Sequence, residues 1–443
     1  MKSVLFRLAL VCALLALAAQ PVLGGSTRQA SKPSAAHAVP NFNTPAAQLR
    51  ITVNRVLAEH AFLLGEAMRA GLGSGEGFEA AGNALEENTT ELVGLIEEVY
   101  GAPAADQFGE LWRNHVAYLV DYTRALEADD DDAQDLAQHQ LHEYVTDFST
   151  FLSGANPKLP EAAVEELVGE HVQQLQSIAA FDAGDYDQAY PAIRRTYEHM
   201  FAIGDALSEA IAMQFPQLFT GKSLAFSPAG DLRLTLDRLL GEHTMLAVTA
   251  MRAGVSDAAD QEAARDALDA NTDALAAAVG SIYGDPAGDA FGDVWSIHTD
   301  AYLEYVTSTL DADTSGQEAA LDSLAEYRTE FSRFLTDANP ELSATALRGL
   351  LEHHTMQLVD HVDAFAAGDY EQAYTIAREA FAHSFEIGDA LALAIAAQFP
   401  FMFPDAATAA PEGRLGLLGS WLLAIVAVSV GVFGVVRRRA SRL

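Results

Sequence analysis

The chain has 443 residues, half of them hydrophobic and 9% aromatic. It is long enough to bury a sizeable core, and disorder is excluded as its main state. Asp and Glu number 62 against 26 Lys and Arg, a formal net charge of −36, which argues against nucleic acid as a partner because phosphate groups would be repelled. The single cysteine, Cys12, lies in an apolar N-terminal run, so we expect neither disulfides nor a thiolate metal site.

Two apolar segments at the ends of the chain predict export and membrane anchoring. Lys2 and Arg7 precede the first apolar run, and small residues follow it, so residues 1–24 are predicted to be a cleaved signal peptide. Residues 415–436 carry no charge and are followed by a basic tail at 437–443. This pattern predicts a single transmembrane helix with a cytoplasmic tail. The membrane is therefore an expected partner, the preceding domains should be extracellular or periplasmic, and no protein partner is indicated.

Between these ends the sequence is a tandem duplication. The motif at residues 67–71 recurs at 250–254, and the motif at 203–207 recurs at 387–391. Such self-similarity is typical of repeated structural units. We therefore expect a disordered leader, a first domain, a linker, a second domain and a stalk, at residues 25–43, 44–220, 221–228, 229–404 and 405–414 respectively.

Within each half the hydrophobic pattern is helical, and Gly, Pro and Asp clusters divide it into segments. In the first half the predicted helices span residues 46–70, 76–100, 103–127, 131–153, 160–182 and 186–214. The predicted fold is all-α, with two tandem homologous six-helix bundles, each of three helical hairpins, plus the C-terminal transmembrane helix.

The histidines follow a finer repeat. His60, His115 and His171 are separated by 55 and 56 residues, and the same two spacings separate His243, His298 and His354. An apolar pair lies three and four residues before each of the six. Residues at these offsets share one helical face, so all six imidazoles are expected to face the bundle interior.

A second polar position recurs 28 residues after each histidine of the first half, where the returning helix is expected. The residues at this position are Asn88, Glu143 and His199 in the first half, and Asn271, Glu326 and His383 in the second. Each predicted hairpin thus offers an inward histidine from its first helix and Asn, Glu or His from its second.

Two interpretations follow from this pattern. Four imidazoles, a carboxylate and an amide in a cysteine-free bundle form a ligand set suited to copper, zinc or iron, with one site per half. Haem is less favoured, because no pair of histidines is singled out as axial ligands. Alternatively, the buried histidines form a hydrogen-bonded network that fixes how the hairpins pack. The predicted ligands are His60, His115, His171, His199, Glu143 and Asn88, and then His243, His298, His354, His383, Glu326 and Asn271.

The sequence therefore favours a membrane-anchored, extracytoplasmic metal-binding protein, with a non-catalytic structural or interaction module at the cell surface as the alternative. No serine elbow, phosphate-binding loop, dinucleotide fingerprint or zinc-protease helix occurs. Enzymatic activity consequently has little support.

The duplicated landmarks, which include Trp-x-x-His, Ala-Asn-Pro, Gly-Asp-Tyr and Gln-Phe-Pro, resemble those of exported bacterial tandem helical-bundle proteins, some of them labelled as related to copper amine oxidases. The resemblance covers both halves. It implies a link to copper but not amine oxidase catalysis, because that chemistry needs an Asn-Tyr-Asp/Glu motif and the chain contains no Asn-Tyr pair.

Overall fold

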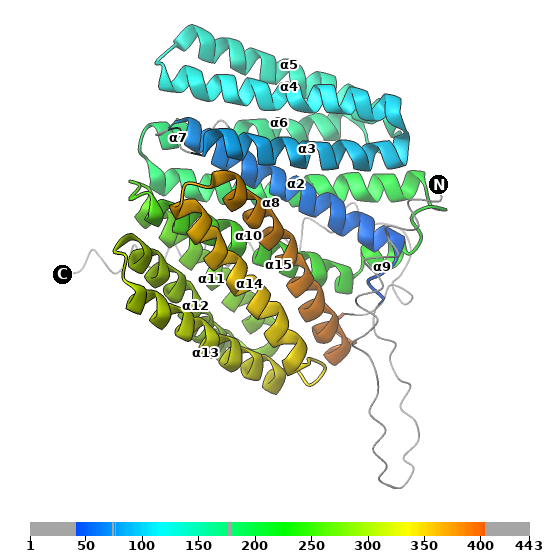
Figure 1. The fold of residues 1–443 in the computed structure, drawn as a ribbon. Coiled ribbons are helices and arrows are strands. Elements are labelled where there is room, and N and C mark those ends of the chain that lie inside the picture. The colour runs from blue at the N-terminus through cyan, green and yellow to red at the C-terminus, as the bar shows by residue number, and fades with distance from the viewer. Residues whose placement is uncertain (1–40, 73–74, 76, 176–178, 404–443) are drawn as a thin grey trace, which may run out of the picture.

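The computed structural model describes residues 41–403, apart from 73, 74, 76 and 176–178. This region is all-α (Figure 1). The first half contains α2 (Pro45–Gly71), α3 (Phe78–Tyr100), α4 (Ala102–Glu127), α5 (Asp131–Ala155), α6 (Glu161–Leu175), α7 (Ala179–Asp182) and α8 (Tyr186–Gln214). The short α9 (Lys222–Ala225) precedes α10 (Pro228–Val255), α11 (Gln261–Tyr283), α12 (Asp285–Leu310), α13 (Thr314–Ala338), α14 (Ala344–Ala366) and α15 (Tyr370–Gln398).

The duplicated sequence begins each half with the same local structure. Thr44 caps α2 by accepting a hydrogen bond from the backbone N–H of Ala47, and Pro45 occupies the first turn. Ser227 caps α10 in the same way, and Pro228 follows it. A short hydroxyl side chain followed by proline is a preferred helix start. The hydroxyl oxygen accepts a hydrogen bond from a backbone N–H of the first turn, and proline has no backbone N–H that would need a partner there.

In the third hairpin of the first half, the described residues of the helix expected at 160–182 belong to α6 and to the four-residue α7, on either side of residues 176–178. The equivalent α14 of the second half spans 23 residues.

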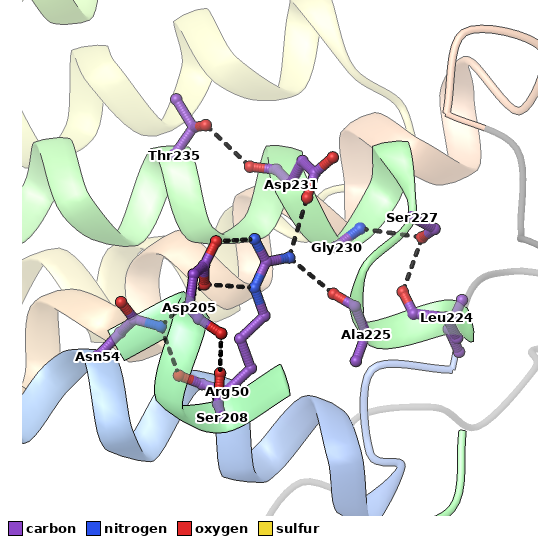
Figure 2. A network of polar contacts seen from close by, with 10 residues as sticks. All are labelled: Arg50, Asn54, Asp205, Ser208, Leu224, Ala225, Ser227, Gly230, Asp231 and Thr235. Atoms are coloured by element: carbon purple, nitrogen blue, oxygen red, sulfur yellow. Dashed lines mark hydrogen bonds and ion pairs between the residues drawn. The ribbon is translucent and has the colours of Figure 1, made fainter. Parts of the chain in front are cut away.

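The segment between the halves, expected to be a plain linker, contains α9 and is held by a buried arginine (Figure 2). The Arg50 guanidinium donates to both carboxylate oxygens of Asp205 at 2.7 and 2.6 Å, to Asp231 at 2.9 Å and to the carbonyl of Ala225 at 2.7 Å. Bidentate pairing of this kind fixes geometry as well as charge. Arg50 therefore ties α2 and α8 to the start of the second half.

The two halves also share a hydrophobic core. One cluster of buried side chains runs from Phe62 and Met68 on α2 to Met251 on α10 and Phe381 on α15. The rings of Phe62 and Phe381 stack with their centroids 6.4 Å apart. Burial of apolar area is the main favourable contribution to folding, so this contact joins the halves energetically.

Within the described residues, one helix is long and apolar enough to cross a membrane, and it is α15. It packs between α10 and α14, and 61% of its apolar window is buried inside the protein. This burial also fits a core helix of a water-soluble domain. The predicted signal peptide, the stalk, the transmembrane helix at 415–436 and the basic tail lie outside the described residues.

Candidate metal centre

Three of the predicted histidines of the second half meet at one point. His243 on α10, His298 on α12 and His354 on α14 each offer a ring nitrogen, and these three atoms all lie within 4.8 Å of one another. The side chains are at most 4% exposed. We call this group the second triad. Helix bundles build metal sites from side chains on facing helices, and this group could hold a metal ion.

The first half brings the equivalent residues together in a wider group. His60 and His115 place their Nε2 atoms 3.2 Å apart, the same distance as His243 and His298. His171 is further away, with its ring centroid 6.5 Å from that of His60. The corresponding distance in the second triad, from His243 to His354, is 5.6 Å. We call His60, His115 and His171 the first triad.

Aromatic rings surround the imidazoles. In the second half the Trp295 ring lies 4.8 Å from His243 and 4.6 Å from His298, and Tyr327 stacks on His298 at 4.4 Å. Trp112 and Tyr144 take the same places in the first half. These rings exclude water and limit the rotation of the imidazoles, so the ligand atoms are held in place before any metal arrives.

Burial keeps the imidazoles neutral. Burial lowers the pKa of His298 to about 3, with the neighbouring His354 adding to the effect. It also lowers the pKa of His115 and of His171 to about 3, and the pKa values of His243 and His354 lie well below the usual value. At neutral pH the rings carry no charge, so their lone pairs are available without loss of a proton.

One hydrogen bond sets the tautomer in the second triad. Nδ1 of His298 bonds to the backbone carbonyl of Trp295. Since a carbonyl only accepts, Nδ1 carries the proton and the lone pair of His298 is on Nε2, which faces His243. Metal-binding histidines are commonly oriented by a hydrogen bond of this kind.

The fourth histidine of each half lies outside its triad. Nε2 of His199 bonds to the carbonyl of Leu167 at 2.9 Å. Both nitrogens of His383 are engaged, Nδ1 with Glu386 at 2.9 Å and Nε2 with the carbonyl of Leu350 at 3.0 Å. A nitrogen that donates to a carbonyl has no lone pair for a metal, so His383 is not positioned as a ligand.

The two predicted acidic ligands are on the surface. The Glu143 side chain is 64% exposed, next to His139, and Glu326 is also exposed. The expectation that these two glutamates face the interior is therefore wrong, because the inward position lies one residue further along each helix. The inward position belongs to the following residue, Tyr144 or Tyr327, because successive residues on a helix point about 100° apart.

The two predicted asparagines are buried but bind the protein. Asn88 donates to Glu59 at 2.7 Å and to the carbonyl of Val56 at 2.9 Å. Asn271 makes the equivalent bonds to Glu242 and Leu239. Both amide nitrogens therefore bind the helices that carry His60 and His243, whereas both amide oxygens are buried without a hydrogen-bond partner.

Sequence reasoning missed the two glutamates that these asparagines bind. Glu59 pairs with Arg378 of the second half at 3.1 Å, and Glu242 pairs with Arg194 of the first half at 2.9 Å. Both glutamates are almost fully buried. The available signal was the Glu-His pair that recurs at 59–60 and 242–243, in which a glutamate adjoins a buried position in each half.

Comparisons with protein-family models, with curated proteins and with solved structures returned no match.

Proposed function

We propose that the protein binds a transition-metal ion at the second triad. The observation that carries this proposal is the convergence of three buried ring nitrogens within 4.8 Å of one another. Burying three imidazoles costs free energy when their nitrogens lack partners, and Nδ1 of His243 and Nδ1 of His354 have no hydrogen-bond partner.

The ligand set restricts the metal. Three neutral imidazoles without thiolate or carboxylate suit copper, zinc or iron rather than calcium or magnesium, which prefer oxygen. Three protein nitrogens also leave a coordination position open, as in catalytic zinc sites. The resemblance to proteins labelled as copper amine oxidase relatives favours copper within this group.

We extend the proposal to the first triad with weaker binding. Its residues are equivalent, but His171 is further from its partners than His354 is. Bonds of about 2.0 to 2.1 Å to three nitrogens would require the α6 end of the site to move inward.

The proposal is tested by elemental analysis of the full chain purified without a histidine tag. We expect at least one equivalent of copper, zinc or iron per chain, and His298→Ala should remove one equivalent. The matched control is His361→Gln, because His361 is equally buried but bonds to the carbonyl of Ala373 outside the triad. If His298→Ala leaves the metal content unchanged, the proposed site is wrong.

We further propose that the helical region containing the triads lies on the outer side of the cell membrane. The reason is that residues 1–24 are predicted to be a signal peptide and residues 415–436 a transmembrane helix. Protease added to intact cells should then degrade the helical region and spare the basic tail. Full protection of the helical region would reject this orientation.

A packing network is the second candidate function, and the Nε2 to Nε2 contact between paired imidazoles favours it. One of these two nitrogens can donate to the other at 3.2 Å in each half. If packing is the role, His298→Gln should lower the free energy of unfolding of the metal-free protein, and the purified chain should contain no stoichiometric metal.

A further inference from the structure

Each half encloses an apolar cavity between its helices. The cavity of the first half has a volume of about 80 Å³ and that of the second about 70 Å³. A single water needs about 10 to 15 Å³, so each cavity has room for a molecule of several heavy atoms.

The two cavities are lined by equivalent residues. Leu57, Leu92 and Phe108 in the first half correspond to Leu240, Leu275 and Phe291 in the second. Protein interiors are close-packed, and large empty spaces are few. A space of similar volume is therefore present at the same place in both copies.

Part of the polar lining is paired within the protein, whereas Nε1 of Trp295 and Nδ1 of His243 and of His354 have no hydrogen-bond partner. In the second half Tyr283 donates to Gln398 at 2.7 Å, and Asn339 donates to the Tyr283 hydroxyl at 3.2 Å. The first half repeats the arrangement with Tyr100, Gln214 and Asn156. Most of the remaining wall is aliphatic and aromatic, and apolar cavities accept uncharged apolar molecules.

The second cavity differs from the first in reaching the histidines. His243 and His354 both line it, whereas the first cavity borders Trp112 but none of the first triad. A molecule in the second cavity therefore touches two of the three imidazoles that form the candidate metal site.

We propose that the second half binds a small, uncharged, apolar molecule in this cavity, in contact with His243 and His354. The contact places that molecule beside the second triad. The binding itself needs only the cavity, so it stands whether or not the proposed metal site is correct.

Xenon is the probe for the cavity, because it is uncharged, apolar and visible by anomalous scattering. Crystals of the metal-free protein under xenon pressure should show a peak in each cavity. Leu275→Phe should abolish the peak in the second cavity alone, and the equivalent Leu92→Phe should abolish only the first. If Leu275→Phe does not fold, Leu391→Phe fills the same cavity from α15.

Contact with the triad is tested in solution on protein labelled at its histidines. Xenon should shift the imidazole NMR signals of His243 and His354 and leave those of His60 unchanged, and Leu275→Phe should remove the shift. The absence of xenon from the second cavity would overturn the proposal. Xenon in the cavity without a shift of either histidine would overturn the contact with the triad.

Discussion

The two triads use the same three residues on equivalent helices, yet the third imidazole lies closer to its partners in the second triad than in the first. The first pair of imidazoles is alike in both halves, with ring centroids 5.2 Å apart in the first and 5.1 Å in the second. The third imidazole makes the difference, because the ring centroid of His171 lies 6.5 Å from that of His60, whereas the centroid of His354 lies 5.6 Å from that of His243.

A contact further along α14 accompanies this difference. Nδ1 of His361 bonds to the carbonyl of Ala373 and so joins α14 to α15. The first half has no histidine between His171 and Gly184. The comparison teaches that the ligand residues alone do not define the site, because the same three residues form triads of different width in the two halves.

The largest expected effect concerns that third ligand. His354→Ala should weaken metal binding by the second half by about 100-fold or more, since losing a ligand should exceed the 10- to 100-fold cost of losing an outer contact. His171→Ala should change the affinity of the first half by less than about tenfold, because His171 is too distant to contribute fully. Competition with a chelator measures both, and equal losses in the two halves would contradict the difference between the triads.

The next prediction concerns Arg378 and Arg194, each of which pairs with a buried glutamate of the other half. Arg378→Ala leaves the buried Glu59 without its cation and should lower the free energy of unfolding by about 3 kcal/mol. Arg194→Ala should cost somewhat less, because Arg194 pairs with Glu242 alone whereas Arg378 also reaches Glu87 and Glu91. Urea denaturation measures both.

Two controls accompany this prediction. Arg113→Ala breaks an exposed pair with Glu86 and should cost less than about 1 kcal/mol. Adding Glu59→Gln to Arg378→Ala should recover part of the lost stability, since the unpaired charge is removed. If the double variant is no more stable than Arg378→Ala, burial of that charge is not the cause.

A smaller effect depends on pH and on one position at which the halves differ. Asn54 of the first half donates to Asp205 at 3.1 Å and to the carbonyl of Arg50 at 2.8 Å. Its equivalent is Asp237, whose two carboxylate oxygens are fully buried without a hydrogen-bond partner. Burial, with the nearby Asp389 charge, raises the pKa of Asp237 well above its usual value, although Arg233 opposes the shift.

The sign of the pH effect follows from this shift. The folded state binds a proton at Asp237 that the unfolded state releases above about pH 4, so the wild type loses stability as the pH rises from there toward the folded pKa. The slope is at most about 1.4 kcal/mol per pH unit. Asp237→Asn should remove this loss and be more stable than the wild type at neutral pH by thermal denaturation. Asn54→Asp should introduce the same loss into the first half, and identical pH profiles for all three proteins would refute the assignment.

The sequence predicted the helices and the inward histidines because both depend on local periodicity. The apolar pairs before His60 and His243 fix the buried face, and proline and glycine mark most helix ends. Glu143 was misplaced because the offset of 28 residues assumes one hairpin geometry, and an error of one residue rotates the side chain to the solvent. The hydrogen bond from His383 to Leu350 could not be predicted, since it depends on how closely two helices approach.

Contacts between the halves were beyond sequence reasoning for a related reason. Arg378 and Glu59 are 319 residues apart in the chain, and no local pattern links them. Gly204 and Gly388 show the same limit. A side chain at Gly204 would collide with Asn54, and one at Gly388 would collide with Asp237. This close approach of two helices is visible only in the folded structure.

The exchange of Glu59 with Arg378 and of Glu242 with Arg194 has a consequence for how the chain is assembled. Each half supplies one glutamate and one arginine, and each receives the equivalent residues in return, which is the arrangement of an isologous interface between two copies of one subunit. A single half carries both members of the contact. Residues 228–404 expressed alone can therefore satisfy their own Glu242 and Arg378 in a symmetric homodimer, and the full chain corresponds to such a dimer joined covalently through α9.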